Sequence, residues 1–349
     1  MGMQRSFHGP GQMHTRIAAL LLTLALASGH LPGAHAAVVL IYHRFDDSRY
    51  PSTNLSLETF RQQLEWLADN RFEVLSASQL IQRLGPGDKL RDNVAVITID
   101  DAYRSLLGAA ALLEEFQFPF SVFASTRPID QQTPDLLDWD ALRSLCRQRG
   151  EILNHAADHD SLLARPGETD DMRRQRILEQ VESAQQRIDS EVPEGCRGRI
   201  FSYPYGEFDL LAEETLAAAG YIAFGQQSGP IAAWDSRQAL PRFPVNQSFA
   251  DSPLMVTKLL SLPFPAVLDR RDPVVSENPP TLTLRGFPQI DQVNCFDGSG
   301  TPLERRVEGS LYLFRAAAPL TRGRNRYNCT YPAGSSGRVH WLSQFWFVP

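Results

Sequence analysis

The sequence predicts an α/β fold, an irregular (β/α) barrel followed by a small C-terminal antiparallel β-domain. Between residues 38 and 225, short apolar runs alternate with segments whose apolar residues recur at helical spacing. Such alternation favours a mostly parallel sheet covered by helices, either open or closed into a barrel. Past a proline-rich stretch at 263–280, the apolar pattern changes to period two with glycine-rich connections, which is typical of a β-sandwich.

The individual elements follow from these patterns. The continuous, largely β-branched run 94–99 gives the clearest strand, and Ser56 and Ser76 are the expected N-caps of two helices. The other strands expected in the first region are 38–42, 72–75, 120–124, 151–154, 200–203 and 223–225, with helices at 106–116, 139–148, 169–189 and 210–219. In the second region we expect strands at 281–284, 311–314 and 339–348. The predicted division is a leader at 1–36, a first domain at 37–262, a linker at 263–280 and a β-domain at 281–349.

Residues 1–36 have the features of a signal peptide. Two arginines precede an apolar run from Ile17 to Ala27, and Ala34-His35-Ala36 forms an A-x-A cleavage site. The apolar run is too short to cross a bilayer as a helix. We therefore expect an exported protein, periplasmic or extracellular, that begins near Ala37 and has no membrane span once cleaved. An uncleaved membrane anchor is the alternative.

Charge and cysteine content limit the partners and the chemistry. The formal net charge of −6 gives no indication of binding to nucleic acid, which requires phosphate neutralisation. Export permits disulfides. We prefer a pairing of Cys295 with Cys329, because both lie in the C-terminal segment, although Cys146 and Cys196 allow other pairings. The favoured role of all four cysteines is structural. The sequence does not indicate an oligomeric state.

Two adjacent carboxylates end the strongest strand, in the sequence Thr98-Ile99-Asp100-Asp101. In parallel α/β folds, functional residues gather at the carboxyl ends of the strands. Neighbouring carboxylates repel, and a bound cation resolves this by holding one of them while leaving the other free to act as a base. The alternative is a solvated turn in which Asp101 caps the next helix.

Three further strand ends carry polar motifs. His155 and His159 are four residues apart, a spacing that would place both imidazoles on one face of a helical turn and offer two nitrogens to one metal. A surface histidine pair is the alternative. The loop Ser202-Tyr203-Pro204-Tyr205-Gly206 is shaped to aim a backbone N–H into a cleft, or is an ordinary turn. His43, after the first strand, is placed to donate a proton, or is a core-edge histidine with a satisfied hydrogen bond.

Taken together and in this order, the motifs resemble those of the polysaccharide deacetylases of carbohydrate esterase family 4. Thr98-Ile99-Asp100-Asp101 is similar to the family's T-F-D-D motif, with Ile in place of Phe. His155 and His159 match its H-x-x-x-H motif, and the loop 202–206 resembles its R-x-P-Y-G motif. The resemblance extends from about residue 38 to residue 245.

The resemblance implies a metal-dependent hydrolase that removes N-acetyl groups from an N-acetylated polysaccharide or oligosaccharide. By this likeness, Asp100 is the general base and Tyr205 supplies a backbone N–H to the oxyanion. The residues that would hold a divalent metal, commonly zinc, are Asp101, His155 and His159.

Two departures from the family pattern involve other residues. The family's acid histidine lies in a late strand, but no histidine occurs between His159 and His340, which leaves His43 as the acid. In this the chain resembles the exported poly-N-acetylglucosamine deacetylases, which carry such a histidine on the first strand. Asp46 or Asp47 is expected to keep it protonated. Ser202 replaces the arginine that steadies the base, and Arg242 is the candidate substitute, unless it is an ordinary surface arginine.

Two other functions compete with the hydrolase. One is a carbohydrate-binding or scaffold protein on a degenerate deacetylase fold, and the other is an iron oxygenase with two histidines and one carboxylate. The complete set of Asp100, Asp101, His155 and His159 argues against a binding module, which has no need of all four. The placement of Asp100 as a base disfavours the oxygenase. The β-domain is expected to bind glycan, to position the enzyme or to cap the barrel.

Overall fold

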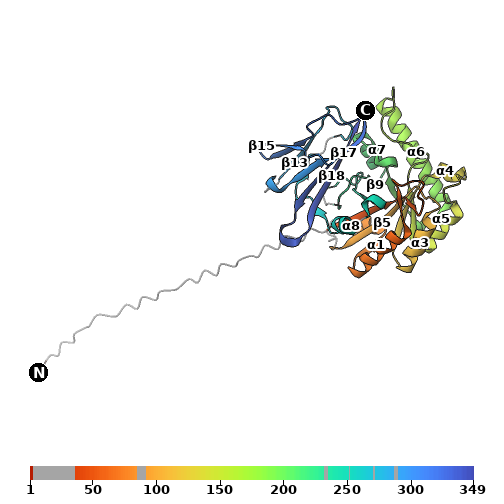
Figure 1. The fold of residues 1–349 in the computed structure, drawn as a ribbon, viewed down its shortest axis with the longest axis horizontal. Coiled ribbons are helices and arrows are strands. Elements are labelled where there is room, and N and C mark those ends of the chain that lie inside the picture. The colour runs from red at the N-terminus through yellow and green to blue at the C-terminus, as the bar shows by residue number, and fades with distance from the viewer. Residues whose placement is uncertain (3–35, 85–91, 232–234, 251, 270–271, 287–289) are drawn as a thin grey trace. The chain divides into compact units, whose positions relative to one another are not determined.

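The computed structural model describes residues 1–2, 36–84, 92–231, 235–250, 252–269, 272–286 and 290–349. The predicted signal peptide therefore lies almost entirely outside the described residues. Two regions follow one another along the rest of the chain, and we call residues 36–259 the α/β domain and residues 262–349 the β-domain (Figure 1). None of the helices in the described ranges is long and apolar enough to cross a membrane.

A single curved sheet forms the centre of the α/β domain. Its strand order is β10-β1-β5-β6-β7-β8-β9, with β4 also paired to β5, and every pairing is parallel. This confirms the predicted α/β class. The strands are β1 (Ala37–Tyr42), β4 (Glu73–Leu75), β5 (Val94–Asp100), β6 (Phe120–Ala124), β7 (Gly150–Asn154), β8 (Arg197–Ser202), β9 (Ile222–Phe224) and β10 (Phe243–Pro244). A small parallel pair, β2 (Arg44–Phe45) with β3 (Asn54–Leu55), lies beside it in sequence.

The sheet curls into a half-barrel, and the short segment 240–244 connects its two edges. Leu240 bridges to Phe224 of β9, and Phe243 pairs with Leu40 of β1. The central strand β5 is buried along its whole length, as expected for a parallel strand covered on both faces. The segment 240–244 therefore places Arg242 between the two edges, next to the carboxyl end of β5.

Helices with local capping signals cover this sheet. Ser56 accepts a hydrogen bond from the Thr59 N–H, and Ser76 forms a capping box with Gln79. The helices are α1 (Leu57–Asp69), α2 (Ala77–Arg83), α3 (Leu106–Glu115), α4 (Thr126–Asp130), α5 (Trp139–Arg147), α6 (Asp170–Glu191), α7 (Leu210–Ala218) and α8 (Ser252–Leu259).

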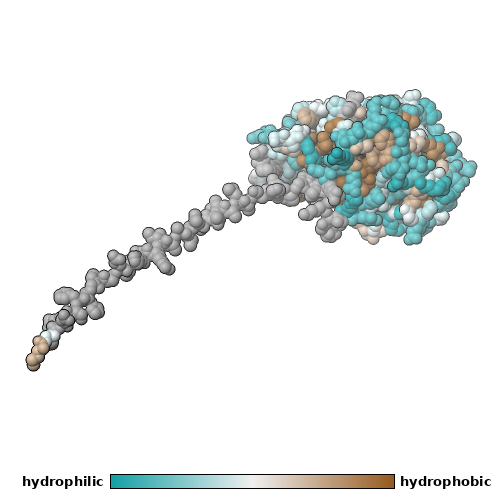
Figure 2. All heavy atoms as spheres, turned by 90° about the horizontal axis from the view of Figure 1, so that it is seen from below, coloured by the Kyte–Doolittle hydropathy of each residue, from teal (hydrophilic) through white to brown (hydrophobic). Residues whose placement is uncertain are grey.

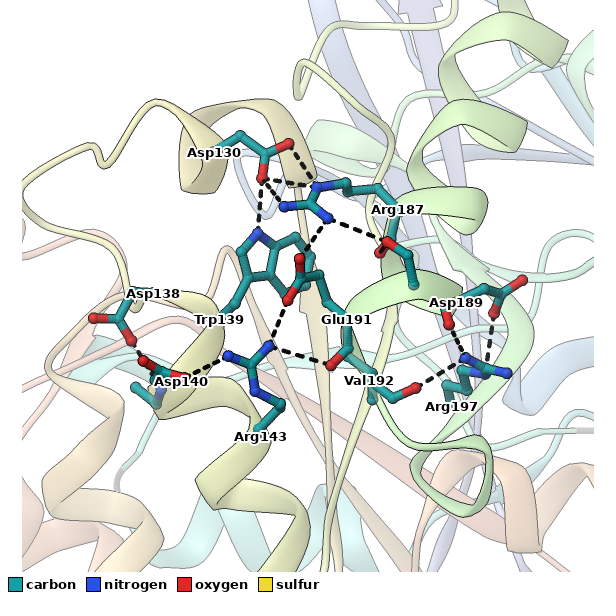
Figure 3. A network of polar contacts seen from close by, with 12 residues as sticks. Asp130, Asp138, Trp139, Asp140, Arg143, Arg187, Asp189, Glu191, Val192 and Arg197 are labelled. Carbon is teal, nitrogen blue, oxygen red and sulfur yellow. Dashed lines mark hydrogen bonds and ion pairs between the residues drawn. The ribbon is translucent and has the colours of Figure 1, made fainter.

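A polar network fixes α4, α5 and α6 to one another (Figure 3). Asp130 at the end of α4 accepts hydrogen bonds from Trp139 of α5, at 2.7 Å, and from Arg187 of α6, at 3.0 Å. Glu191 of α6 in turn pairs with Arg143 of α5 and with Arg187. These contacts hold the helices that follow β6 and β7, the strands that lead toward the candidate site. Elsewhere the surface is mainly hydrophilic on the face shown in Figure 2, with hydrophobic residues in scattered groups.

The β-domain consists of two four-stranded sheets with the orders β11-β18-β17-β14 and β12-β13-β16-β15. Their strands are β11 (Leu262–Pro263), β12 (Val267–Leu268), β13 (Thr281–Arg285), β14 (Asn294–Asp297), β15 (Glu304–Glu308), β16 (Leu311–Arg315), β17 (Gly323–Pro332) and β18 (Val339–Val348). The aromatic residues Phe345, Trp346 and Phe347 of β18 are buried.

The structure differs from the predicted linker at 263–280. Its first residues belong to the β-domain, because β11 pairs with β18 and β12 pairs with β13. Both are two-residue edge strands, where a proline such as Pro263 is tolerated, since the hydrogen bond that proline cannot donate is not required there. Proline content alone therefore extended the predicted linker too far toward the N-terminus.

Two disulfides join neighbouring elements. Cys295 of β14 and Cys329 of β17 are directly opposite in the antiparallel ladder and are bonded, which confirms the predicted pair. The second disulfide joins Cys146 of α5 to Cys196, just before β8. The two domains also share packing: the ring of Trp341 in β18 meets Phe243 of β10 edge-on, with centroids 5.4 Å apart.

Candidate metal centre and its cleft

Asp100 and Asp101 lie where β5 ends, and the backbone separates them. Asp100 is the last residue of the strand and is fully buried, whereas Asp101 has a φ of 72° and begins a turn. Because side chains alternate along a strand, Thr98 and Asp100 face the same side of the sheet. Both carboxylates nevertheless approach one nitrogen: His155 Nε2 lies 3.8 Å from Asp100 Oδ2 and 3.3 Å from Asp101 Oδ1.

Arg242 surrounds the carboxylate of Asp100 on that side. Its Nη1 and Nη2 donate to Oδ1 and Oδ2 of Asp100 at 2.7 and 2.9 Å, in bidentate geometry. The other donors reach the Gly225 carbonyl at 2.9 Å, Thr98 Oγ1 at 3.2 Å and Ser202 Oγ at 2.6 Å. All five N–H groups of this buried guanidinium are therefore satisfied. Arg242 is a core residue with none of its surface exposed, not a surface arginine.

This arrangement sets the protonation state of Asp100. Burial alone raises the pKa of the carboxyl, but the positive charge and hydrogen bonds of Arg242, together with nearby histidines, outweigh burial and lower the pKa below its ordinary value. Ser202 also donates to Oδ2 of Asp100 at 3.2 Å. The short side chain of Ser202 thus leaves room for a guanidinium that comes from the segment just before β10.

Asp101, His155 and His159 bring three potential metal ligands together. Asp101 Oδ1 lies 3.3 Å from His155 Nε2 and 3.0 Å from His159 Nε2. One ligand atom from each residue lies within 4.8 Å of the others. The burial of Asp101 raises its carboxyl pKa, but the two imidazoles outweigh burial and hold this pKa well below the ordinary value. An anionic oxygen and two ring nitrogens thus face one point.

The two histidines do not lie on a helical turn, contrary to the sequence prediction. Ala156 and His159 have positive φ values of 66° and 62°, so the segment after β7 is an irregular loop. Its N–H groups bond to neighbouring elements in place of an i−4 carbonyl: that of His155 to the Ala124 carbonyl and that of Ala157 to the Gln180 carbonyl. The two rings are therefore brought together by tertiary hydrogen bonds and not by a helical turn, and their centroids are 4.9 Å apart.

Hydrogen bonding fixes the tautomer of His155 in a form suited to a metal. Its Nδ1 lies 2.7 Å from the Ser202 carbonyl, which can only accept, so Nδ1 carries a hydrogen and Nε2 is the ring nitrogen left to bind a metal. Asp101 Oδ1 is buried and faces this nitrogen. Burial lowers the pKa of His155, but Asp100 and Asp101 outweigh burial and raise it above its ordinary value. A cation at this position, either a proton on Nε2 or a divalent metal in its place, prevents the two lone pairs from repelling each other at 3.3 Å. The residues therefore fit a divalent metal.

His43 follows β1 and lines the same cleft as Asp101, His155 and His159. Burial lowers the pKa of His43, and the opposing effects of Asp101 and Asp100 do not restore the ordinary value. The expectation that Asp46 or Asp47 keeps it protonated is wrong. Asp46 accepts the Leu57 N–H at 2.9 Å, and Asp47 pairs with Arg44 and Arg49.

Tyr205 lines the cleft beside His159, in a strained loop. It has a φ of 59°, its side chain is half-exposed, and its ring meets that of His159 edge-on at a centroid distance of 4.6 Å. Arg324 of β17 donates a hydrogen bond to the Tyr205 carbonyl and a second, of 3.2 Å, to Gln226 Oε1. A side chain of the β-domain thus holds the loop that carries Tyr205.

The cleft has a volume of about 1060 Å³, and the β-domain supplies one of its walls. That wall includes Arg324 and Arg326 of β17, the β14–β15 turn and residues 316–321. Sequence reasoning did not identify these residues, since neither arginine belongs to a motif and both are distant in sequence from the α/β strands.

Comparisons with known proteins agree with the motifs. Residues 87–224 match the family model described as Polysaccharide deacetylase. Over 250 residues the chain is 27% identical to the poly-beta-1,6-N-acetyl-D-glucosamine N-deacetylase of Escherichia coli (strain K12), covering 60% of this chain. The chain spans only 37% of the length of that relative.

Solved structures show the same fold. The Streptococcus pyogenes deacetylase PplD in complex with acetate has a TM-score of 0.57 at 14% identity, covering 64% of this chain and 98% of that one. IcaB from Ammonifex degensii has a TM-score of 0.54 at 20% identity, covering 64% and 97%. Fold, motif order and family model agree, and they make this chain similar to the polysaccharide deacetylases over its α/β domain.

Proposed function

We propose that this protein is a metal-dependent hydrolase that removes N-acetyl groups from an N-acetylated polysaccharide or oligosaccharide. The observation that carries the proposal is the convergence of Asp101, His155 and His159 beside a buried, ionised Asp100. The resemblance to a poly-N-acetylglucosamine deacetylase supports an N-acetylglucosamine polymer as the substrate. A binding protein on this fold has no need of the fully bonded pair of Asp100 and Arg242.

The proposed ligands are Asp101, His155 and His159, and two nitrogens with one carboxylate oxygen suit zinc. When bound, the metal would supply Lewis acidity toward the acetyl carbonyl and toward a water molecule. Asp100, held ionised by Arg242, accepts a proton from the attacking water. The backbone N–H of Tyr205 stabilises the oxyanion, and His43 delivers a proton to the leaving amine.

We further propose that the protein is exported and acts in the periplasm or outside the cell. The sequence of residues 1–36 supports a signal peptide. Two disulfides pair all four cysteines, which is typical of proteins that fold in an oxidising compartment.

Removal of the metal should abolish acetate release, and Zn²⁺ should restore it. We expect about one equivalent of metal per wild-type chain by elemental analysis, and a large loss of metal in His159→Ala, since the site would retain only two of its ligands. The assay measures acetate released from N-acetylated and O-acetylated glycans. Equal acetate release before and after chelation, or equal metal content in His159→Ala, would contradict the assignment.

His43→Ala should retain metal and lose about 10²-fold or more of the turnover on amide substrates. An activated aryl acetate should suffer less, because its leaving group needs little protonation. Amide turnover in the wild type should also decline as pH rises through the lowered pKa of His43, since only the protonated ring can donate. The acid assignment fails if both substrates lose turnover equally in His43→Ala.

A further inference from the structure

The candidate cleft is larger than the chemistry at the metal centre requires. Its volume of about 1060 Å³ is at or above the upper end of the roughly 300–1,000 Å³ typical of small-ligand sites. The three ligand residues, His43 and Tyr205 line the part formed by the α/β domain. The rest of the lining comes from the β-domain, so the space extends beyond the group that reacts.

Strand β17 presents two arginines to this space. Arg324 and Arg326 are two residues apart and therefore lie on the same face of the strand, and both line the cleft. Arg324 is committed to the Tyr205 carbonyl and to Gln226. Arg326 is different: its Nε is buried and has no hydrogen-bond partner among the described residues. A buried donor left unpaired costs free energy, which a bound acceptor would recover.

The cleft wall near these arginines has a polar part, the β14–β15 turn with Asp297 and Ser299, and an apolar part. The segment Ala316-Ala317-Ala318-Pro319-Leu320 lines the cleft, and its three central residues are exposed. The side chain of Phe345, opposite Arg326 in the ladder, also lines it. Small apolar residues beside the unpaired N–H donor of Arg326 suit a ligand that has flat aliphatic faces and many oxygen acceptors. A neutral sugar has both features, with C–H groups on its ring faces and hydroxyl and acetamido oxygens at its edges.

We propose that the β-domain forms binding subsites for an extended N-acetylated glycan, and that Arg326 contacts a sugar residue beyond the one whose acetyl group is cleaved. The inference rests on the proposed function for the identity of the occupant. It assigns to the β-domain a part in glycan binding, in addition to its packing against the α/β domain.

Binding to a protein that cannot turn the ligand over tests this inference. The background is full-length, metal-loaded Asp100→Asn, and the probes are N-acetylglucosamine and short oligomers of β-1,6-linked N-acetylglucosamine, measured by calorimetry. We expect the oligomer to bind more tightly than the monosaccharide. Arg326→Gln should weaken oligomer binding about tenfold, the effect of losing hydrogen bonds from a charged donor. Arg322→Gln, at an exposed arginine outside the cleft lining, should bind the oligomer like the background.

Each outcome decides the inference. Equal affinity for monosaccharide and oligomer, no binding of either, or oligomer binding by Arg326→Gln equal to that of Arg322→Gln overturns it. If Arg326→Gln lowers the melting temperature, Arg326→Met, which keeps an aliphatic stem without donors, is subject to the same criterion. If the background variant binds the oligomer but the wild type releases no acetate, the proposed reaction is wrong and the proposed subsites stand. If the wild type releases acetate but the Arg326 variants bind the oligomer as the background does, the proposed subsites are wrong and the proposed reaction stands.

Discussion

Asp100→Asn should leave the metal bound while lowering the turnover number for deacetylation by about 10²–10⁴-fold, the usual range for loss of a general base. The carboxylate is ionised in the fold because Arg242 outweighs its burial, so it is ready to accept a proton from water. An amide cannot accept that proton. Metal binding should persist, because the three proposed ligands are other residues.

The measurement is acetate release together with the metal content of the purified variant. Thermal unfolding is needed as well, since the substitution leaves the buried Arg242 without its counter-charge. Asp69→Asn, at an exposed position on α1, is the matched control and should behave as the wild type. Unchanged turnover by a metal-loaded Asp100→Asn protein would refute the base assignment.

Arg242→Gln should cost both activity and stability. Removing one partner of a buried ion pair typically destabilises a fold by about 3–5 kcal/mol, and here it also releases Thr98 and Ser202 from their hydrogen bonds. Burial raises the pKa of Asp100, and in this variant the charge of Arg242 no longer opposes that effect. The pKa of Asp100 should therefore rise. A protonated Asp100 cannot take the proton of water, and turnover should fall by an amount comparable to that of Asp100→Asn.

The pH dependence of unfolding distinguishes this explanation from simple loss of packing. In the wild type the folded-state pKa of Asp100 is lowered, so its contribution to stability is present above the ordinary carboxyl pKa and is lost as pH falls through the lowered value. In Arg242→Gln, with the pKa raised, the sign reverses: stability from this group declines as pH rises from the ordinary pKa to the raised one. If Arg242→Gln has the turnover and the pH profile of unfolding of the wild type, Arg242 neither keeps Asp100 ionised nor stabilises the fold through it.

An exchanged pair provides the matched rescue. Ser202 Oγ lies 2.6 Å from Arg242 Nη2, so an arginine at position 202 starts beside the space that the guanidinium of Arg242 occupies. We expect Ser202→Arg combined with Arg242→Ser to recover part of the turnover and of the stability lost in Arg242→Ser alone. If the double variant recovers neither turnover nor stability, the position of the arginine on the segment 240–244 matters as much as its charge.

Local signals in the sequence determined the elements and their type. The buried run of β5, the caps Ser56 and Ser76 and the period-two pattern of β18 each depend on interactions within a few residues, which sequence spacing records directly. Parallel strands end at one edge of a sheet, so motifs at successive strand ends could be expected to meet. The pair Cys295 and Cys329 followed from proximity within the C-terminal segment and is observed.

Tertiary structure decided the contacts between residues far apart in sequence. Asp100 and Arg242 are 142 residues apart, and only the curling of the sheet turns a candidate arginine into a fully bonded partner. The histidines share a site through a loop held by Ala124 and Gln180, where helical spacing predicted a turn. The short strands β11 and β12 exist because β18 and β13 pair with them. In the same way Arg324 reaches Tyr205 because the β-domain packs beside the cleft, and such long-range packing leaves no periodic trace in the sequence.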